Sequence, residues 1–250
     1  MDLIEEDKIS PYAFWAFYSL YNHLNKGSKF EGNHKSSDHI KFDPSLNIIN
    51  QKLFPEFDPT DFNEKKSLFI TWKKKAKHGN EYHLRGCIGT FSKLPCYYGI
   101  ERYSLLASLE DPRFPPITKN ELPLLKCGCN ILSNFTTIYL NNNQTITGDI
   151  LDWEIGKHGI ELKFRYPFKH GKLLSATFLP DVMVEQRWDK RDTFINLIEK
   201  ADVLASPAEI FENYDKYFVQ VIRYEGHKSM IAYDQFESKL KELKNVSESL

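Results

Sequence analysis

Apolar residues recur at helical spacing in several segments of the chain. The segment at residues 12–24 follows the start signal Ser10-Pro11 and is aromatic nearly all round, which predicts a helix that is buried on more than one side. Three further helical patterns are shorter, and Pro180-Asp181 predicts the start of another short helix. The three patterns cover residues 100–109, 189–200 and 233–243.

Other segments are rich in β-branched and aromatic residues, which is typical of strands. They cover residues 68–72, 82–91, 125–132, 160–166, 173–179 and 217–224. The first two flank a basic turn at residues 73–80 and predict a β-hairpin. Helices and strands mix without strict alternation, so we expect an α+β fold.

A polar stretch at residues 25–66 has no sustained period and predicts a long surface loop. A short ordered piece is expected within it, at residues 46–54.

The amino-acid composition excludes several classes of protein to which the chain could belong. The 250 residues allow one or two domains, and a core is available because 14% of the residues are aromatic. Lys and Arg number 33 and Asp and Glu 34, which argues against a dedicated nucleic-acid or membrane-surface protein. The four Cys are too few for a disulfide framework. No apolar run reaches the ~18 residues of a membrane span, and no export signal is visible. We therefore expect a soluble, cytoplasmic protein, with a nuclear location left open.

The segment at residues 83–91 contains the residues that are most suited to catalysis or ligand binding. On a regular strand, His83, Arg85 and Cys87 share one face, where the two basic groups favour the thiolate form of the cysteine. Gly86 and Gly89 remove side chains next to that thiol, and glycine in a strand marks close approach by a ligand or another backbone. Alternatively, Cys87 is a small core residue and Arg85 a structural ion-pair partner.

The six residues Leu84-Arg85-Gly86-Cys87-Ile88-Gly89 are identical to the signature of the AMMECR domain family, and other blocks resemble that family in order along the chain. These blocks lie at residues 68–73, 111–116, 152–160, 177–182, 185–189 and 223–224. The chain departs from the family chiefly at residues 25–66 and 141–149.

The resemblance implies one AMMECR-type domain at residues 10–235, followed at residues 236–250 by a helix end and tail. It implies an α+β fold of two intertwined lobes, with mixed or antiparallel sheets flanked by helices and the signature in a groove between the lobes. No biochemical activity is established for the family, so the resemblance supplies no reaction.

Two functional hypotheses follow. In the first, the groove holds a small-molecule or catalytic site in which Cys87 is the nucleophile or redox thiol, and His83 or His158 is a general base. Arg85, Gly86 and Gly89 would bind the ligand. In the second, the signature shapes a docking groove of a non-catalytic adaptor, because the chain lacks a complete triad or metal set. The partner is thus an unknown small molecule or a protein, and the sequence leaves open whether the chain is an enzyme.

Several other residues have two interpretations. Arg187 and Trp188 could bind a ligand together or form a stacked structural pair. His158 could instead cap a turn next to a strand. Asp181 and Glu185 near a helix start more often serve as caps than as catalytic carboxylates.

Metal, cofactor and nucleic-acid sites are not expected. Cys127 and Cys129 fall on the apolar face of a strand without the spacing of a zinc site, and Cys96 is expected in a loop. No phosphate-binding glycine motif occurs. The basic run at residues 73–77 could contact nucleic acid, but a solvated hairpin tip agrees better with the near-neutral chain.

Overall fold

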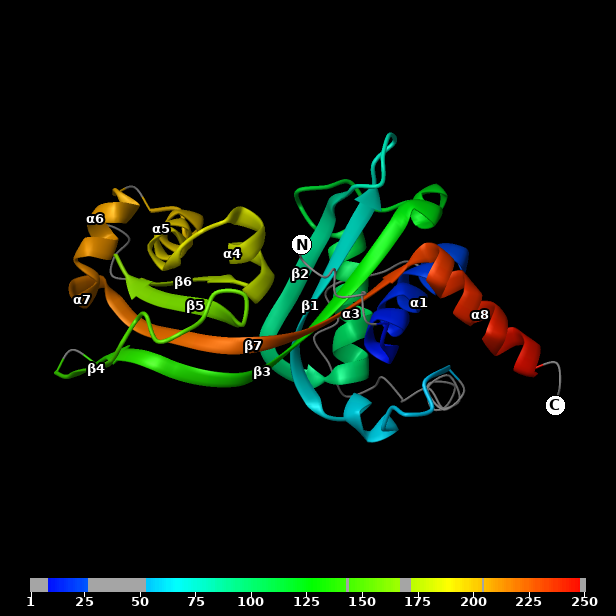
Figure 1. The fold of residues 1–250 in the computed structure, drawn as a ribbon, viewed down its shortest axis with the longest axis horizontal. Helices are drawn as coiled ribbons and strands as arrows, with labels where there is room; N and C mark the ends of the chain where they lie inside the picture. Colours follow the sequence, from blue (N-terminus) through cyan, green and yellow to red (C-terminus); the bar gives the residue numbers. More distant parts are fainter. Residues whose placement is uncertain (1–8, 27–52, 143, 167–171, 204, 248–250) are drawn as a thin grey trace, which may run out of the picture. The chain divides into compact units, whose positions relative to one another are not determined.

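A computed structural model describes residues 9–26, 53–142, 144–166, 172–203 and 205–247. Helices and strands are both present, and the predicted α+β class is confirmed (Figure 1). The chain divides into two compact units: Met1–Ile131 with His227–Leu250, and Leu132–Gly226. Two long strands, β3 (Leu125–Asn141) and β7 (Phe218–Ala232), contribute residues to both units.

Unit 1 combines helices with one part of the sheet, in which the strand order is β2-β1-β3-β7. Its elements, besides parts of β3 and β7, are α1 (Pro11–Lys26), η1 (Pro59–Phe62), β1 (Lys65–Lys75), β2 (Tyr82–Pro95), α3 (Cys96–Leu109), η2 (Lys119–Leu124) and α8 (Tyr233–Ser247). β2 is the edge strand and pairs antiparallel with β1. β1 and β2 therefore form the predicted hairpin.

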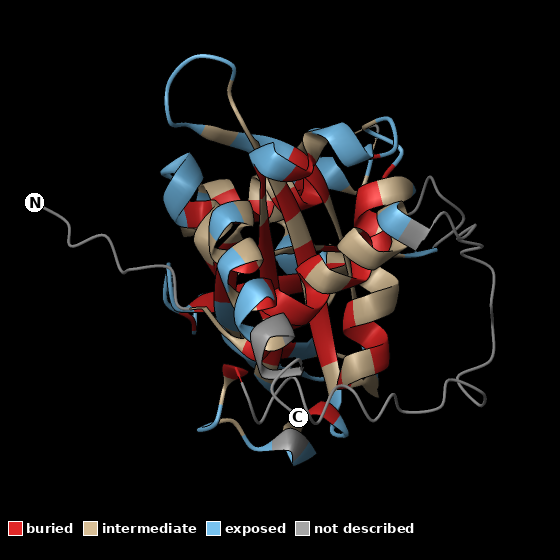
Figure 2. Cartoon of the chain, turned by 90° about the vertical axis from the view of Figure 1, so that its right-hand side faces the viewer, coloured by how far each residue is buried: buried red, intermediate tan, exposed pale blue. Residues whose placement is uncertain are grey.

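Aromatic rings dominate the core of unit 1. Trp72 of β1 is fully buried and donates its ring N–H to the Ser104 carbonyl of α3 over 3.1 Å. Phe17 of α1 packs edge-on against Trp72 and stacks on Phe236 of α8, with ring centroids 5.2 and 4.6 Å apart. Figure 2 shows buried residues along the strands and on the inner faces of the helices. The burial predicted for α1 on more than one side is confirmed, since residues 13–17 are all buried.

Unit 2 has its own core. Its elements, besides parts of β3 and β7, are β4 (Ile146–Gly148), β5 (His158–Arg165), β6 (Leu173–Phe178), α4 (Pro180–Gln186), α5 (Lys190–Lys200), α6 (Pro207–Glu212) and α7 (Tyr214–Tyr217). The strand order is β3-β7-β5-β6, and β4 pairs with β3. Apolar residues of β5 and α5, such as Leu162, Phe194 and Leu197, are fully buried together.

Some boundaries differ from the sequence-based predictions. The three lysines at 73–75, predicted in a turn, continue β1, because each pairs with a residue of β2. The predicted loop cysteine Cys96 begins α3 and is fully buried. The prediction of a surface loop up to residue 66 is wrong for its last part, where Phe62 enters the core of unit 1 and β1 begins at Lys65. Most of the ordered piece predicted at residues 46–54 lies outside the described residues.

Candidate functional site

A β-bulge lies inside the signature segment. Trp72 of β1 pairs with Gly86, but the next residue, Lys73, pairs with Leu84, so Arg85 is an extra residue in β2. The bulge shifts the alternation of side chains by one position. Cys87, opposite Thr71, therefore lies on the outer face of the sheet, whereas His83 lies on the face of the buried Trp72. The prediction that His83, Arg85 and Cys87 share one face is wrong for Cys87.

Cys87 is half-buried on this outer face, and its Sγ lies 3.1 Å from the Thr71 hydroxyl oxygen. The three other cysteines are buried, and none of the four forms a disulfide. Burial raises the pKa of the Cys96 thiol to about 12 and holds the pKa of the Cys127 and Cys129 thiols well above the usual value. Cys87 thus differs from the other three in its access to solvent.

The backbone of Cys87 is bound at the open edge of β2 by two charged side chains. Its N–H donates to Asp111 Oδ2 over 2.8 Å, and its carbonyl accepts from Arg113 Nη2 over 3.1 Å. Arg113 also donates to both oxygens of Asp111, at 2.9 and 2.6 Å. Because an edge strand exposes hydrogen-bonding groups, this pair protects β2 at the position of Cys87. It also places a half-exposed guanidinium beside the thiol.

Arg85 is buried and bound by the protein. Its Nε and Nη2 donate to the two oxygens of Glu121, both over 3.1 Å, and its Nη1 and Nη2 donate to the Pro115 and Pro116 carbonyls over 2.8 and 3.3 Å. Four of the five guanidinium N–H groups have acceptors in these contacts. The arrangement favours the structural interpretation of Arg85, and Arg113 is the cation beside Cys87.

Two carboxyl groups in this region have strongly lowered pKa values. Hydrogen bonds from Arg113 are the main cause for Asp111, whose pKa is about 2. Burial opposes ionisation of Glu121, but hydrogen bonds from Arg85, Lys74 and the Thr118 backbone outweigh it and lower its pKa to about 2.

We expect the stability of the protein to fall in acid because of these two groups. Their folded pKa values lie below the ordinary 3.8 and 4.5, so their contribution is complete above about pH 4.5 and is lost as the pH falls towards 2. The loss is on the order of 2–3 kcal/mol for each group. Urea unfolding between pH 3 and 7 measures it. The slope of the unfolding free energy with pH should shrink in Glu121→Gln and stay unchanged in Glu242→Gln, an exposed control. Equal slopes in the two variants would contradict this assignment.

The signature glycines are explained by close packing. A Cβ at Gly86 would overlap the carbonyl oxygen of Ala107 in α3, and a Cβ at Gly89 would overlap the Phe69 ring and the Leu68 carbonyl oxygen. Gly86 therefore lets α3 approach the sheet, and Gly89 lets the ring of its cross-strand partner Phe69 lie over the backbone. A ligand-binding role for either glycine stays a prediction.

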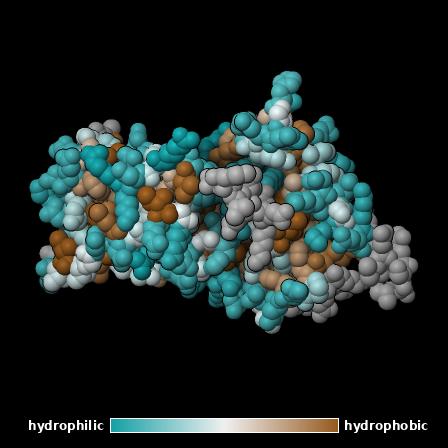
Figure 3. Space-filling model, in the orientation of Figure 1, coloured by the Kyte–Doolittle hydropathy of each residue, from teal (hydrophilic) through white to brown (hydrophobic). Residues whose placement is uncertain are grey.

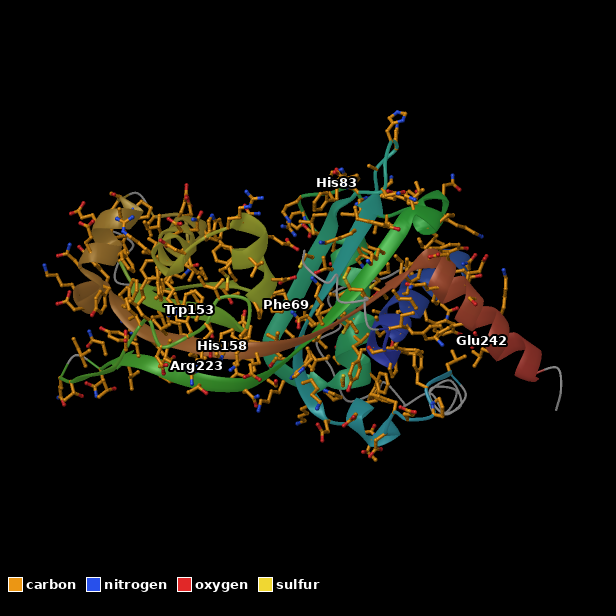
Figure 4. The ribbon with its side chains drawn as sticks, viewed as in Figure 1. Phe69, His83, Trp153, His158, Arg223 and Glu242 are labelled. Carbon is orange, nitrogen blue, oxygen red and sulfur yellow. The ribbon has the colours of Figure 1, made fainter. Side chains whose placement is uncertain are left out.

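His83 and Phe69 lie at different levels of the β1–β2 hairpin (Figure 4). His83 is exposed and pairs with Lys74, on the face opposite to Cys87. Its predicted role as a general base next to the thiol has no support in this geometry. The turn of the hairpin beyond it is hydrophilic (Figure 3).

His158 belongs to unit 2, where Figure 4 shows it next to Arg223. Its Nδ1 accepts the backbone N–H of Glu154 over 3.0 Å, and its Nε2 lies 3.9 Å from a Glu225 carboxylate oxygen. Burial, with the charges of Arg223 and Lys157, lowers its pKa. A neutral imidazole that binds the turn at residues 154–158 matches the structural interpretation, while its catalytic role stays a prediction.

Arg187, also in unit 2, ends α4 in a left-handed conformation, with φ of 57°, and is exposed. The neighbouring Trp188 packs edge-on against Phe178, with ring centroids 5.1 Å apart. The ligand-binding role of Arg187 stays a prediction.

The described residues contain neither a metal-binding cluster nor a membrane-spanning helix. No group of three or more His, Cys, Asp or Glu side chains there is placed to hold a metal ion. None of the helices in the described ranges is long and apolar enough to cross a membrane.

Sequence reasoning did not single out Thr71, Asp111, Arg113 or Glu121. The block at residues 111–116 was visible as a recurring turn, but nothing in it indicated that its charged residues bind the backbone of Cys87. Thr71 could be placed opposite Cys87 only with knowledge of the bulge.

Comparisons with known proteins extend over most of the chain. The family model described as AMMECR1 matches residues 15–228. The uncharacterized protein YOR289W of Saccharomyces cerevisiae is 56% identical over 241 residues, which cover 94% of this chain and 90% of that protein. The uncharacterized protein At2g38710 of Arabidopsis thaliana is 38% identical over 161 residues, covering 64% of this chain and 69% of that protein.

A solved structure shares the fold. The uncharacterized protein PH0010 from Pyrococcus horikoshii matches with a TM-score of 0.60 and 18% identity, covering 88% of this chain and 89% of that one. At this identity the likeness concerns the fold alone.

Proposed function

The chain belongs to the AMMECR1 family, and from this premise we propose that the outer face of the β1–β2 hairpin is a small-molecule or catalytic site with the Cys87 thiol as its reactive group. The observation that carries the proposal is the contrast among the four cysteines, since Cys87 is half-buried and the others are buried. A thiol that serves only as packing is usually enclosed by apolar side chains.

Two neighbours support reactivity at this position. The Thr71 hydroxyl lies within hydrogen-bonding distance of the sulfur, and a hydroxyl that donates to a thiolate stabilises it. The Arg113 guanidinium contacts the carbonyl of the same residue and adds positive charge, although its ion pair with Asp111 weakens that field. Cys87 remains the proposed nucleophile or redox thiol. The cation next to it is Arg113 and not, as the sequence suggests, Arg85.

The rate of alkylation of Cys87 by iodoacetamide, followed against pH, tests the proposal. We expect an apparent pKa below the ordinary ~8.5 for this thiol. Thr71→Val, which keeps the shape and removes the hydroxyl, should shift the profile to higher pH. Cys87→Ser is the control that removes the signal from this site. An apparent pKa at or above the ordinary value in the folded protein would overturn the nucleophile role.

The alternative is a non-catalytic protein-binding module. The exposed aliphatic residues of unit 2 include Leu151, Ile155 and Val184, which are exposed by 42%, 41% and 55%. They lie on the loop before β5 and on α4, which meet where Val184 approaches Gly156. In Figure 3, the brown areas on the surface of unit 2 are hydrophobic residues that are open to solvent. An ordinary pKa for Cys87 would favour this alternative.

A further inference from the structure

The outer face that presents Cys87 continues towards the turn of the β1–β2 hairpin, and there it becomes basic. Thr71, Lys73 and Lys75 alternate along β1 on this face, and the last two pair with Leu84 and Tyr82 of β2. A third lysine comes from β3, because the Lys126 ammonium lies 5.7 Å from the centre of the Tyr82 ring. We call this group the lysine face. It consists of Lys73, Lys75, Tyr82, Leu84 and Lys126.

The opposite face of the same strands also carries basic residues. Lys74 and Arg85 lie there and both bind Glu121, at 2.7 and 3.1 Å, so a carboxylate of the protein balances their charge. The bulge at Arg85 thus separates two basic groups. One is tied to η2 through Glu121, and the other surrounds an aromatic ring on the outer face.

The lysine face combines charge with a flat apolar surface. Its three lysines and Tyr82 are half-buried, so their apolar parts cover the sheet while the ammonium groups extend towards solvent. Leu84, at 42% exposed, adds aliphatic surface between the ring and Cys87. An ammonium group binds phosphate as a compact point charge, and an aromatic ring stacks on planar groups.

We propose that the lysine face binds a small organic anion in which a phosphate group is joined to a planar apolar ring. This inference rests on the proposed function, because it names the ligand class for the face that presents Cys87. The phosphate is held by the lysines, and the ring packs on Tyr82 and Leu84. Thr71 and Lys73 are two residues apart on one strand, roughly 7 Å, so a ligand of this size reaches from the lysines to the thiol.

The dimensions and charge of the face favour a small anion over a nucleic acid. Non-specific nucleic-acid binding relies on roughly 6–10 phosphate contacts, whereas this face offers three ammonium groups on a chain of net charge -1. The proposal therefore commits to a low-molecular-weight ligand.

Isothermal titration with 1-naphthyl phosphate, and with the neutral 1-naphthol for comparison, tests the proposal on the full chain. We expect the phosphate to bind more tightly than the neutral compound. The double variant Lys73→Gln/Lys126→Gln should weaken phosphate binding by about 4- to 25-fold, since one exposed charge contributes about two- to fivefold. The matched control Lys93→Gln/Lys119→Gln removes two exposed lysines of the same unit and should change the affinity by less than twofold.

Three results would overturn the proposal: equal affinity for naphthol and naphthyl phosphate, equal affinity in the two double variants, or no binding by the native chain. A 20-nucleotide oligothymidine that binds more tightly than naphthyl phosphate and depends on Lys73 and Lys126 would also overturn it, in favour of a nucleic acid. Cys87→Ser separates the two proposals, because it should keep naphthyl phosphate binding within twofold. If the Cys87 thiol has an ordinary pKa while this lysine-dependent binding persists, the reactive role fails and the ligand class stands.

Discussion

Replacement of Gly86 by alanine should destabilise the protein by ~3 kcal/mol or more. The added Cβ would overlap the Ala107 carbonyl oxygen, which belongs to the backbone of α3 and cannot rotate away. Either α3 leaves the sheet or β2 distorts, and both disturb the core around Trp72. Urea unfolding monitored by circular dichroism measures the loss.

Gly128→Ala is the matched control for this prediction. Gly128 is also a buried strand glycine of unit 1, but a Cβ there would meet its nearest neighbours, Met230 and the Thr71 carbonyl, at an ordinary 3.7 Å. We expect its stability to stay within about 1 kcal/mol of the native chain. Gly86 and Gly128 variants of equal stability would show that the approach of α3 does not require glycine.

Replacement of Arg85 by methionine should cost ~3 kcal/mol. The half-buried Glu121 carboxylate loses two hydrogen bonds and keeps those from Lys74 and Thr118, and the Pro115 and Pro116 carbonyls lose a charged donor. Methionine preserves the length of the side chain and removes its charge and hydrogen bonds. The measurement is again the free energy of unfolding at pH 7, where Glu121 is ionised.

A double-mutant cycle separates this pair from the rest of the site. Arg85→Met/Glu121→Gln should be more stable than the sum of the two single changes implies, because the second change removes the carboxylate that Arg85 no longer binds. Strictly additive effects, or an Arg85→Met variant within about 0.5 kcal/mol of the native chain, would contradict the structural role of Arg85 and return it to the candidates for ligand binding.

Local patterns were enough to predict much of the fold. The aromatic helix α1, the β1–β2 hairpin and the apolar face of β3 follow from periodicity, because each buries one consistent set of side chains. The composition of the lysines that extend β1 resembles a loop and predicts a turn, whereas their pairing with β2 makes them part of the strand. α6 and α7 are too short for a period to appear.

The candidate site was less predictable, because one residue changes its geometry. On a regular strand, Cys87 and Arg85 would lie on the same face. The bulge at Arg85 separates them, and it depends on two partners of Arg85, Pro115 and Glu121, which lie 30 and 36 positions away in the sequence. Asp111 and Arg113 join the site through contacts with the backbone of Cys87, and a sequence pattern carries no sign of such contacts. The residue types of the signature are enough to single it out as a candidate site, but they do not predict which of its residues are structural and which is exposed.

Arg85, Gly86 and Gly89 build the hairpin, while Cys87 alone among the four cysteines is presented to solvent. Brief treatment of the native protein with iodoacetamide, followed by mass-spectrometric mapping of all four cysteines, tests this division. We expect modification at Cys87, with Cys96, Cys127 and Cys129 unmodified until urea unfolds the chain. If Cys87 is modified no faster than the three buried cysteines under native conditions, the thiol belongs to the core and the outer face is not its site.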